Sequence, residues 1–469
     1  MTTATARFVA AVAAAALVLS SAQPALAQQG SQPSIVRDAE IEDTLRVMAR
    51  PAIVAAGLDP AEIDLHLVGD STINAFVTNG QNIFVHTGLI LEAENANEVI
   101  GVLAHETGHI SGGHVPRTAQ AIRYAMRPAL IALGLGILAI AAGAPQAGAA
   151  IISGAPQFAQ ANFVRHTQVQ ESAADQAGAG FLEASGQTGR GLIDFFNREL
   201  RPMEFAVRRV PAYMVTHPFS SDRVEALRQR VEGGEHYNAT EDPEIASRFA
   251  MMQAKLVGFI QPLARTLQLY PATDRSQPAR YARAIAYCGC GVASRIPDLT
   301  RALAEINSLI VDDPNNPYYE ELAGQIYFEN GRAAESIAHH RRALQLAPNE
   351  PLLQVNLARS LIAANGRAGA DEAIPILQRA LQTEPENAFA WRELASAYDI
   401  RREDGLARLA SAEQAYAIGD LPRARIFAER ARRSLTQGTT SWQRASDIVA
   451  SVTNELPEGE PPQPRNPRG

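Results

Sequence analysis

The stretch His105-Glu106-Thr107-Gly108-His109 constrains this chain more than any other part of its sequence. Residues four apart lie on the same face of an α-helix, so His105 and His109 can share one metal ion only if the stretch is helical. Glu106 then stands beside the open position of that metal. The pattern indicates a metal-dependent hydrolase; the alternative is a pair of surface histidines on a solvated helix.

The residues before the motif favour a partly buried helix. Asn95 is a preferred N-cap residue, and Glu98 follows it with the spacing of an acidic residue in the first turn. An apolar stripe comes next, formed by Val99, Ile100, Val102 and Leu103. We therefore expect a capped helix that begins just after Asn95.

Length and charge limit the classes of protein that the chain can represent. It has 469 residues, of which 46% are hydrophobic and 20% charged, which fits a globular protein of two to four domains. The formal net charge is -8 and the sequence has no basic run, which argues against nucleic acid as a partner.

The N-terminus has the features of a cleaved export signal. Arg7 is followed by the apolar run 8–19 and by the small-residue pattern Ala25-Leu26-Ala27. The apolar run is too short to span a membrane. We expect residues 1–27 to be a signal peptide, Gln28 to start the mature chain, and the periplasm to be its location.

Residues 28–255 are predicted to form an α+β domain that is mostly helical with a small sheet. A helix is expected over 35–57, and Asn79-Gly80 is typical of a hairpin turn. Short β-prone runs lie at 65–68, 75–78 and 83–86. An edge strand of this sheet can hold an extended peptide by main-chain pairing.

A catalytic zinc needs a third protein ligand beyond the two histidines. A metzincin-like pattern requires a histidine at 115, where the chain has valine, and His114 stands one place too early. The alternative is Glu171 in a helical run over about 161–184. Asp175 lies on the same face four residues later, where it can accept the other N–H of a ligand histidine.

These residues together resemble one known family. The matching motifs are His105 to His109 followed by His114, Glu171 with Ala174-Asp175, Thr216-His217-Pro218, and Arg223. The chain is similar to the zinc metallopeptidase family of HtpX and the CAAX prenyl endopeptidase, and most similar to its exported members with helical repeats. The resemblance implies one Zn2+ per chain, proteolysis of misassembled outer-membrane β-barrel proteins, and a chaperone-like role in their assembly.

Zinc held by His105, His109 and Glu171 is expected to activate a water molecule and polarise the scissile carbonyl. Glu106 is expected to take the proton from that water and deliver it to the leaving amine.

The resemblance leaves two roles open for His217. It either occupies the fourth metal position and keeps the enzyme latent, or binds the oxyanion in the transition state. The alternative is a purely structural histidine before proline in a loop. Arg223 is expected either to orient the substrate or the loop that holds His217, or to complete a local carboxylate network. Ser220 to Asp222 are predicted to cap the helix that follows.

Residues 129–155 are rich in alanine, glycine and leucine and carry no charge. Their continuous apolar part is shorter than a membrane span, which favours a buried helical hairpin over a segment that covers the cleft or contacts a membrane surface.

Residues 256–455 show the period of tetratricopeptide repeats. Pro314, Pro348 and Pro385 follow one another after 34 and 37 residues, with 367–371 as a small insertion. Such repeats stack into a solenoid that binds peptides or proteins, and here it is expected to bind substrates or the β-barrel assembly machinery. The paired Cys288 and Cys290 are expected to be either small buried residues or a labile redox pair. Residues 456–469 read as a Pro-rich disordered tail.

The sequence thus predicts an exported zinc endopeptidase with a repeat domain. Two alternatives remain: a non-proteolytic repeat chaperone with a latent metal site, and an integral-membrane prenyl-type protease. The second would need several long spans, and the sequence shows none after residue 27.

Overall fold

The computed structural model describes residues 34–78, 81–114, 135, 167–205, 213, 216–218, 220–290 and 296–455. The predicted signal peptide, the Asn79-Gly80 turn, the stretch 129–155 apart from Leu135, and the C-terminal tail lie outside these residues. None of the described helices is both long enough and apolar enough to cross a membrane.

A four-stranded sheet lies at the centre of the N-terminal domain. Its strands are β1 (Ser34–Val36), β2 (Asp64–Gly69), β3 (Ala75–Thr78) and β4 (Asn82–His86), in the spatial order β1-β2-β4-β3. β2 and β4 pair in parallel, whereas β1 and β3 pair antiparallel to their neighbours. The three strands expected from the sequence are confirmed, and β3 forms one edge of the sheet.

The expected helix over 35–57 is wrong at its start. Residues 34–36 pair with β2, and α2 spans Ala39–Ala55. The Asp38 side chain accepts a hydrogen bond from the Ile41 amide, which fixes the beginning of the helix there. Ile35 and Val36 are β-branched residues that suit a strand, and this preference prevails before the cap.

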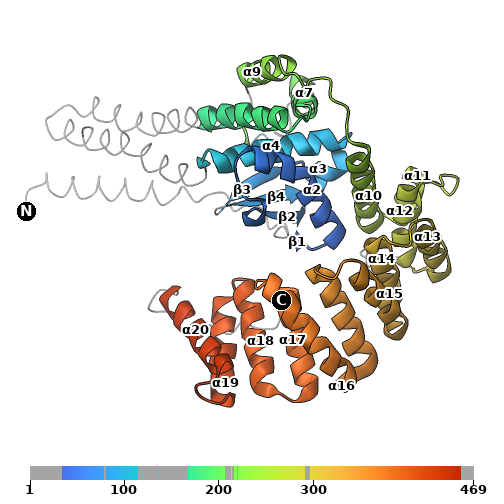
Figure 1. Ribbon diagram of the computed structural model, residues 1–469, viewed down its shortest axis with the longest axis vertical. Helices are drawn as coiled ribbons and strands as arrows, with labels where there is room; N and C mark the ends of the chain where they lie inside the picture. The colour runs from blue at the N-terminus through green and yellow to red at the C-terminus, as the bar shows by residue number, and fades with distance from the viewer. Residues whose placement is uncertain are drawn as a thin grey trace, which may run out of the picture.

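The helix with the metal motif is α4 (Ala96–Ser111), and it is buried between the sheet and other helices. The Asn95 side chain accepts from the Glu98 amide, so the helix begins where the sequence predicts. α4 contacts α2 and β3, and α3 (Thr87–Glu92) leads into it from β4 (Figure 1).

Close helix packing brings distant residues beside α4. The described part of the helix that carries Glu171 spans 167–184. A Cβ on Gly108 would lie 2.7 Å from the carbonyl oxygen of Ala174, and one on Gly178 would lie 3.0 Å from the Ala104 carbonyl. The two helices therefore touch backbone to backbone, which only glycine at these positions allows.

The remaining catalytic-domain helices are α7 (Arg190–Phe205), packed on α4, and α9 (Ser221–Glu232). Ser220 caps α9 by accepting from the Arg223 amide, as expected. α10 (Pro243–Ile260) contacts α2, α3 and α4 on one side and α12 on the other. This single helix runs through residue 255 and joins the two parts of the chain.

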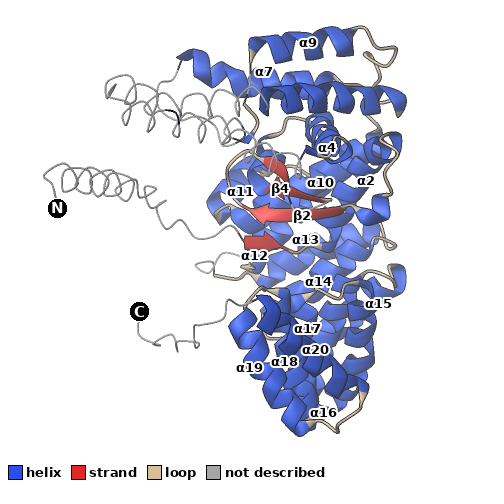
Figure 2. Cartoon of the chain, turned by 90° about the vertical axis from the view of Figure 1, so that its left-hand side faces the viewer, coloured by secondary structure: helices blue, strands red, loops and turns tan. Residues whose placement is uncertain are grey.

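The repeat half is a row of antiparallel helices that curves away from α10 and passes beneath the sheet in Figures 1 and 2. The helices are α11 (Leu263–Leu269), α12 (Gln277–Cys288), α13 (Leu299–Asp312), α14 (Pro317–Glu329), α15 (Ala333–Leu346), α16 (Pro351–Thr383), α17 (Ala388–Arg401), α18 (Asp404–Ala417), α19 (Leu421–Ser434) and α20 (Thr440–Glu455). Consecutive helices pack on one another, as stacked helical repeats require. The predicted fold class is confirmed.

Two features of the solenoid add to the predictions, a kinked helix and a disulfide. α16 contains a kink at Gly366, where φ is 51°, so two repeat helices follow without a loop and the expected insertion 367–371 is helical. Cys288 ends α12, and a disulfide joins it to Cys290 just beyond the helix.

Candidate metal centre

Four side chains from three separate parts of the chain converge beside α4. They are His105, His109, Glu171 and His217, all buried, and one ligand atom from each lies within 4.8 Å of the others. His105 and His109 come from α4, Glu171 from helix 167–184, and His217 from the segment before α9. The structure thus brings the three predicted ligands together and adds His217 to them.

The distances between these atoms fit a tetrahedral ion. The Nε2 atoms of His105 and His109 are 3.1 Å apart, and the Glu171 carboxylate oxygens lie 3.5 and 3.4 Å from them. His217 Nδ1 lies 3.3 Å from His105 Nε2 and 3.1 Å from Glu171 Oε2. A tetrahedron with zinc–ligand distances of about 2.0–2.1 Å has edges of roughly 3.3–3.4 Å. The donor set and its spacing therefore suit zinc.

Each histidine is held by a partner on its other ring nitrogen. His105 Nδ1 lies 2.9 Å from Asp175 Oδ1, His217 Nε2 donates to the Ala75 carbonyl at 3.1 Å, and His109 Nδ1 lies 3.0 Å from the ring of His114. A nitrogen that donates to such a partner leaves the opposite nitrogen with a lone pair. These lone pairs and the Glu171 carboxylate point at one another, which only a cation or a proton between them can stabilise.

Charge in the cluster is arranged to receive a cation. Burial acts against a charged His105, but hydrogen bonds with Asp175 and Glu171 outweigh it and raise its pKa to about 10. Burial likewise opposes ionisation of Glu171, yet hydrogen bonds from His105 and His217 hold the pKa of its carboxyl well below the usual range. Burial lowers the pKa of His109. A metal ion would replace the His105 proton, so binding must release a proton.

Glu106 is fully buried, and neither of its oxygens has a hydrogen-bond partner among the described residues. Burial raises the pKa of its carboxyl. Its Oε1 lies 3.4 Å from His217 Nε2, at the border of the ligand cluster. An orphaned carboxylate in such a place is suited to accept a proton from a water molecule that enters the site.

Arg223 connects the ligand cluster to the segment that carries His217. Its guanidinium makes two hydrogen bonds to Asp175, of 2.8 and 2.9 Å, and a third of 2.6 Å to the Pro218 carbonyl. Its Nη2 lies 3.3 Å from Glu171 Oε2. Of the two roles expected for Arg223, this geometry fits the carboxylate network.

Sequence reasoning missed two contacts. His114, which stands one place too early for a metzincin-like ligand, does not join the ligands, but it lies against the far nitrogen of His109. Gly113, with φ of 60°, turns the chain back after α4 and makes that contact possible. The Ala75 carbonyl that holds His217 carries no side-chain signal, and only the position of β3 beside α4 could reveal it.

Comparison with known proteins also indicates a metallopeptidase. The pattern of peptidase family M48 matches residues 36–231, which include all four residues of the cluster. The chain is 26% identical over 377 residues to the beta-barrel assembly-enhancing protease of Yersinia pestis, covering 79% of this chain and 74% of the relative. It is also 26% identical over 381 residues to the protein of that name from Escherichia coli K12, with the same coverage.

Among solved structures, the chain is similar to the crystal structure of MamA, with a TM-score of 0.26 and 20% identity, over 34% of this chain and 88% of that one. That overlap is too small for a conclusion. The metal cluster, the orphaned Glu106 and the sequence matches agree with one another. The catalytic domain therefore matches peptidase family M48 over residues 36–231, and the chain is a metalloendopeptidase.

Proposed function

We propose that this chain is an exported zinc endopeptidase that cleaves unfolded or misassembled outer-membrane β-barrel proteins in the periplasm and assists their assembly. The observation that carries the catalytic part is the convergence of four ligand atoms beside the unpartnered carboxylate of Glu106. The substrate class is supported by similarity to relatives named beta-barrel assembly-enhancing proteases.

When bound, a zinc ion supplies Lewis acidity and a water nucleophile whose pKa is lowered to about 7. Glu106 accepts the proton of that water, since both its oxygens are free of hydrogen bonds within the described structure. The carboxyl then donates this proton to the leaving amine, and its raised pKa suits both transfers. Asp175 holds the His105 ring in the required tautomer.

The substrate backbone is proposed to pair with the free edge of β3. This strand pairs only with β4 in the described sheet, and it lies against α4. Main-chain pairing of this kind selects extended polypeptide with little regard to side chains, which suits an enzyme for unfolded proteins.

His217 is proposed to keep the resting enzyme latent. Its Nδ1 takes the fourth corner of the ligand cluster, where a catalytic site needs an open position for water. Its Nε2 also donates a hydrogen bond to the Ala75 carbonyl on β3, and this acceptor is then unavailable to a substrate. One ring thus blocks both the metal and the first backbone acceptor, and its departure would open both.

The non-proteolytic chaperone remains the second candidate, because a fourth protein ligand is what a closed structural metal site contains. Cleavage of an unfolded β-barrel protein by residues 28–469, with Glu106→Gln as the control, separates the two. Cleavage by the parent chain and none by Glu106→Gln, with zinc retained in both, is the expected result. If neither the parent chain nor His217→Ala cuts while both hold zinc and substrate, the endopeptidase proposal is wrong and the chaperone role stands.

A further inference from the structure

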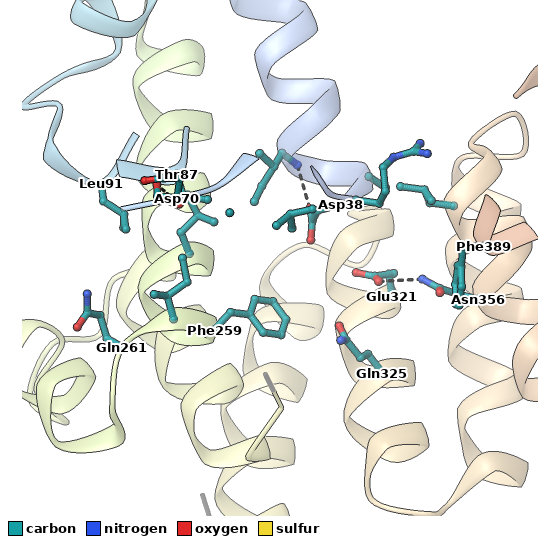
Figure 3. Close-up of a pocket in the computed structure, with 18 of the residues that line it drawn as sticks. Asp38, Asp70, Thr87, Leu91, Phe259, Gln261, Glu321, Gln325, Asn356 and Phe389 are labelled. Atoms are coloured by element: carbon teal, nitrogen blue, oxygen red, sulfur yellow. Dashed lines mark hydrogen bonds between the residues drawn. The ribbon is translucent and has the colours of Figure 1, made fainter. Parts of the chain in front are cut away.

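A cavity of about 620 Å³ separates the catalytic domain from the solenoid. One wall is formed by the start of α2, the loop after β2 and helix α3, and a second by the C-terminal end of α10. The third wall belongs to α14, α15, α16 and α17 of the solenoid. Figure 3 shows Asp38, Leu91 and Phe259 on the first two walls, opposite Gln325 and Phe389 on the third.

The solenoid wall is built from whole helix faces. Two helices supply most of its residues, Glu321, Gln325 and Phe328 on α14 and Leu352, Asn356 and Arg359 on α16. In each helix they are spaced by four and then three residues, so they form one continuous stripe. Both helices place apolar as well as polar groups on this wall. Such a surface suits an extended chain, whose side chains differ from one position to the next.

The side chains that line the cavity carry a net negative charge. Its carboxylates are Asp38, Asp70, Glu92 and Glu321. The two arginines of the lining, Arg37 and Arg359, are already neutralised by carboxylates that do not line the cavity. Their partners are Glu42 and Glu384 for Arg37, and Glu329 for Arg359. A ligand that complements this cavity must therefore be basic.

The carboxylate of Glu321 is only partly satisfied by hydrogen bonds. Its side chain is turned into the cavity in Figure 3, although the residue is only 8% exposed. Oε1 accepts a hydrogen bond of 3.1 Å from Asn356, whereas Oε2 has no hydrogen-bond partner within the described residues. A buried carboxylate oxygen left in this state is costly, and a donor from a ligand would remove the cost.

The nearest ammonium group does not satisfy Glu321. Lys255 Nζ lies 3.8 Å from Glu321 Oε2, but 2.8 Å from Asp38 and 3.1 Å from Glu40. Three carboxylates therefore share one cation in a buried place. Burial raises the pKa of Glu321 to about 7, and the negative charges of Asp38 and Glu40 act in the same direction. A second cation would let all three carboxylates ionise.

We propose that this cavity binds an extended polypeptide segment that presents a lysine or arginine side chain to Glu321 and places neighbouring apolar side chains against Phe259 and Phe328. The inference rests on the proposed function only for the claim that the segment belongs to an unfolded substrate. The cavity adjoins β1, and the metal centre adjoins β3. Three strand spacings separate these edges, about 14 Å, which four or five extended residues can cover.

Binding is tested on the zinc-loaded Glu106→Gln chain, so that no peptide is cut and a failure of the peptidase proposal leaves the result unchanged. The probe is a fluorescent unstructured peptide of about twelve residues with lysines among leucines and serines, followed by anisotropy. The same peptide with glutamate for lysine should bind at least about tenfold more weakly. Equal affinity for the two peptides would overturn the proposal.

Two substitutions locate the peptide. Glu321→Gln should weaken binding of the lysine peptide about tenfold or more, because a buried charge-assisted hydrogen bond is lost. Gln325→Lys leaves the Lys255 cluster intact and should weaken binding by charge repulsion, so it tests the cavity even if Glu321→Gln destabilises the fold. Glu335→Gln, an exposed carboxylate of α15 outside the cavity, is the matched control and should have no effect. Unchanged binding in Gln325→Lys, with native circular dichroism, rules the site out.

A competing occupant is the chain's own C-terminal stretch, which contains Arg465 and Arg468. A chain ending at residue 455 should bind the lysine peptide as the full chain does. If truncation instead strengthens binding severalfold, the cavity belongs to that stretch in the resting protein and the proposal is refuted.

Discussion

Contact between helix 167–184 and α4 sets the metal centre, and Gly178→Ala tests it. A Cβ there would lie 3.0 Å from the carbonyl carbon and oxygen of Ala104 and from the His105 amide nitrogen. Favourable carbon contacts are at about 3.5–4.0 Å, so the two helices must separate by roughly 0.5 Å. Glu171 and His105 stand on opposite sides of this contact, and their ligand atoms are 3.5 Å apart.

The magnitude follows from two opposing effects. Overpacking of this kind costs about 1–3 kcal/mol. Alanine in place of glycine within a helix is favoured by about 1 kcal/mol, which leaves a net loss of up to about 2 kcal/mol. Metal–ligand distances tolerate only about 0.2 Å, so this loss should appear as weaker zinc binding, by up to about 30-fold.

Gly180→Ala is the control on the same helix. A Cβ at Gly180 would meet only the end of the Arg230 side chain, at 3.7 Å, an ordinary contact. This variant should therefore be more stable than the parent by up to about 1 kcal/mol. Melting temperature and zinc affinity, by competition with a chromogenic chelator, are measured for both. Equal values for the two variants would show that the helices are not in tight contact and refute the reasoning.

Three further results are expected. His217→Ala should raise basal cleavage of an unfolded substrate, since the fourth ligand corner becomes free; a fall in kcat with unchanged zinc content would assign His217 to the oxyanion instead. Asp175→Asn should weaken zinc binding by about 10-fold to 100-fold in a chelator titration and lower the melting temperature, because Arg223 loses its buried charge partner; an unchanged zinc affinity would contradict the orienting role. Burial lowers the pKa of His340 to about 4, so the unfolded chain binds this proton from about pH 6.5 downward and the folded chain does not. Stability should fall as the pH drops through that window, by about 2 kcal/mol at pH 5, and urea midpoints of His340→Gln should lack that part of the loss.

Local sequence determined the helix ends and the strands of the catalytic domain. Asn95 and Ser220 cap helices through their own side chains, and the β-prone runs form the expected strands because both effects act over a few residues. The period of the prolines similarly determined the stacked helices of the solenoid. The start of α2 was not predicted correctly, because residues 34–36 pair with β2, a segment about thirty residues away in the sequence.

The metal centre also has a part that the sequence predicts and a part that depends on packing. Two ligands four residues apart on one helix are fixed by helix geometry, so His105 and His109 follow from the sequence alone. Glu171 could be proposed from its spacing to Asp175, but its distance to the histidines depends on the glycine contacts between two helices.

Only the tertiary structure decided what surrounds these ligands. It placed His217 at the fourth corner with its other nitrogen on the Ala75 carbonyl, and it left Glu106 without a hydrogen-bond partner in the described structure. It also set Glu321 of the solenoid against Lys255 and Asp38 across a cavity that neither half contains by itself. Sequence patterns report the helix or strand to which a side chain belongs. Contacts between elements depend on how the faces of those elements pack, and that is decided by the whole core at once.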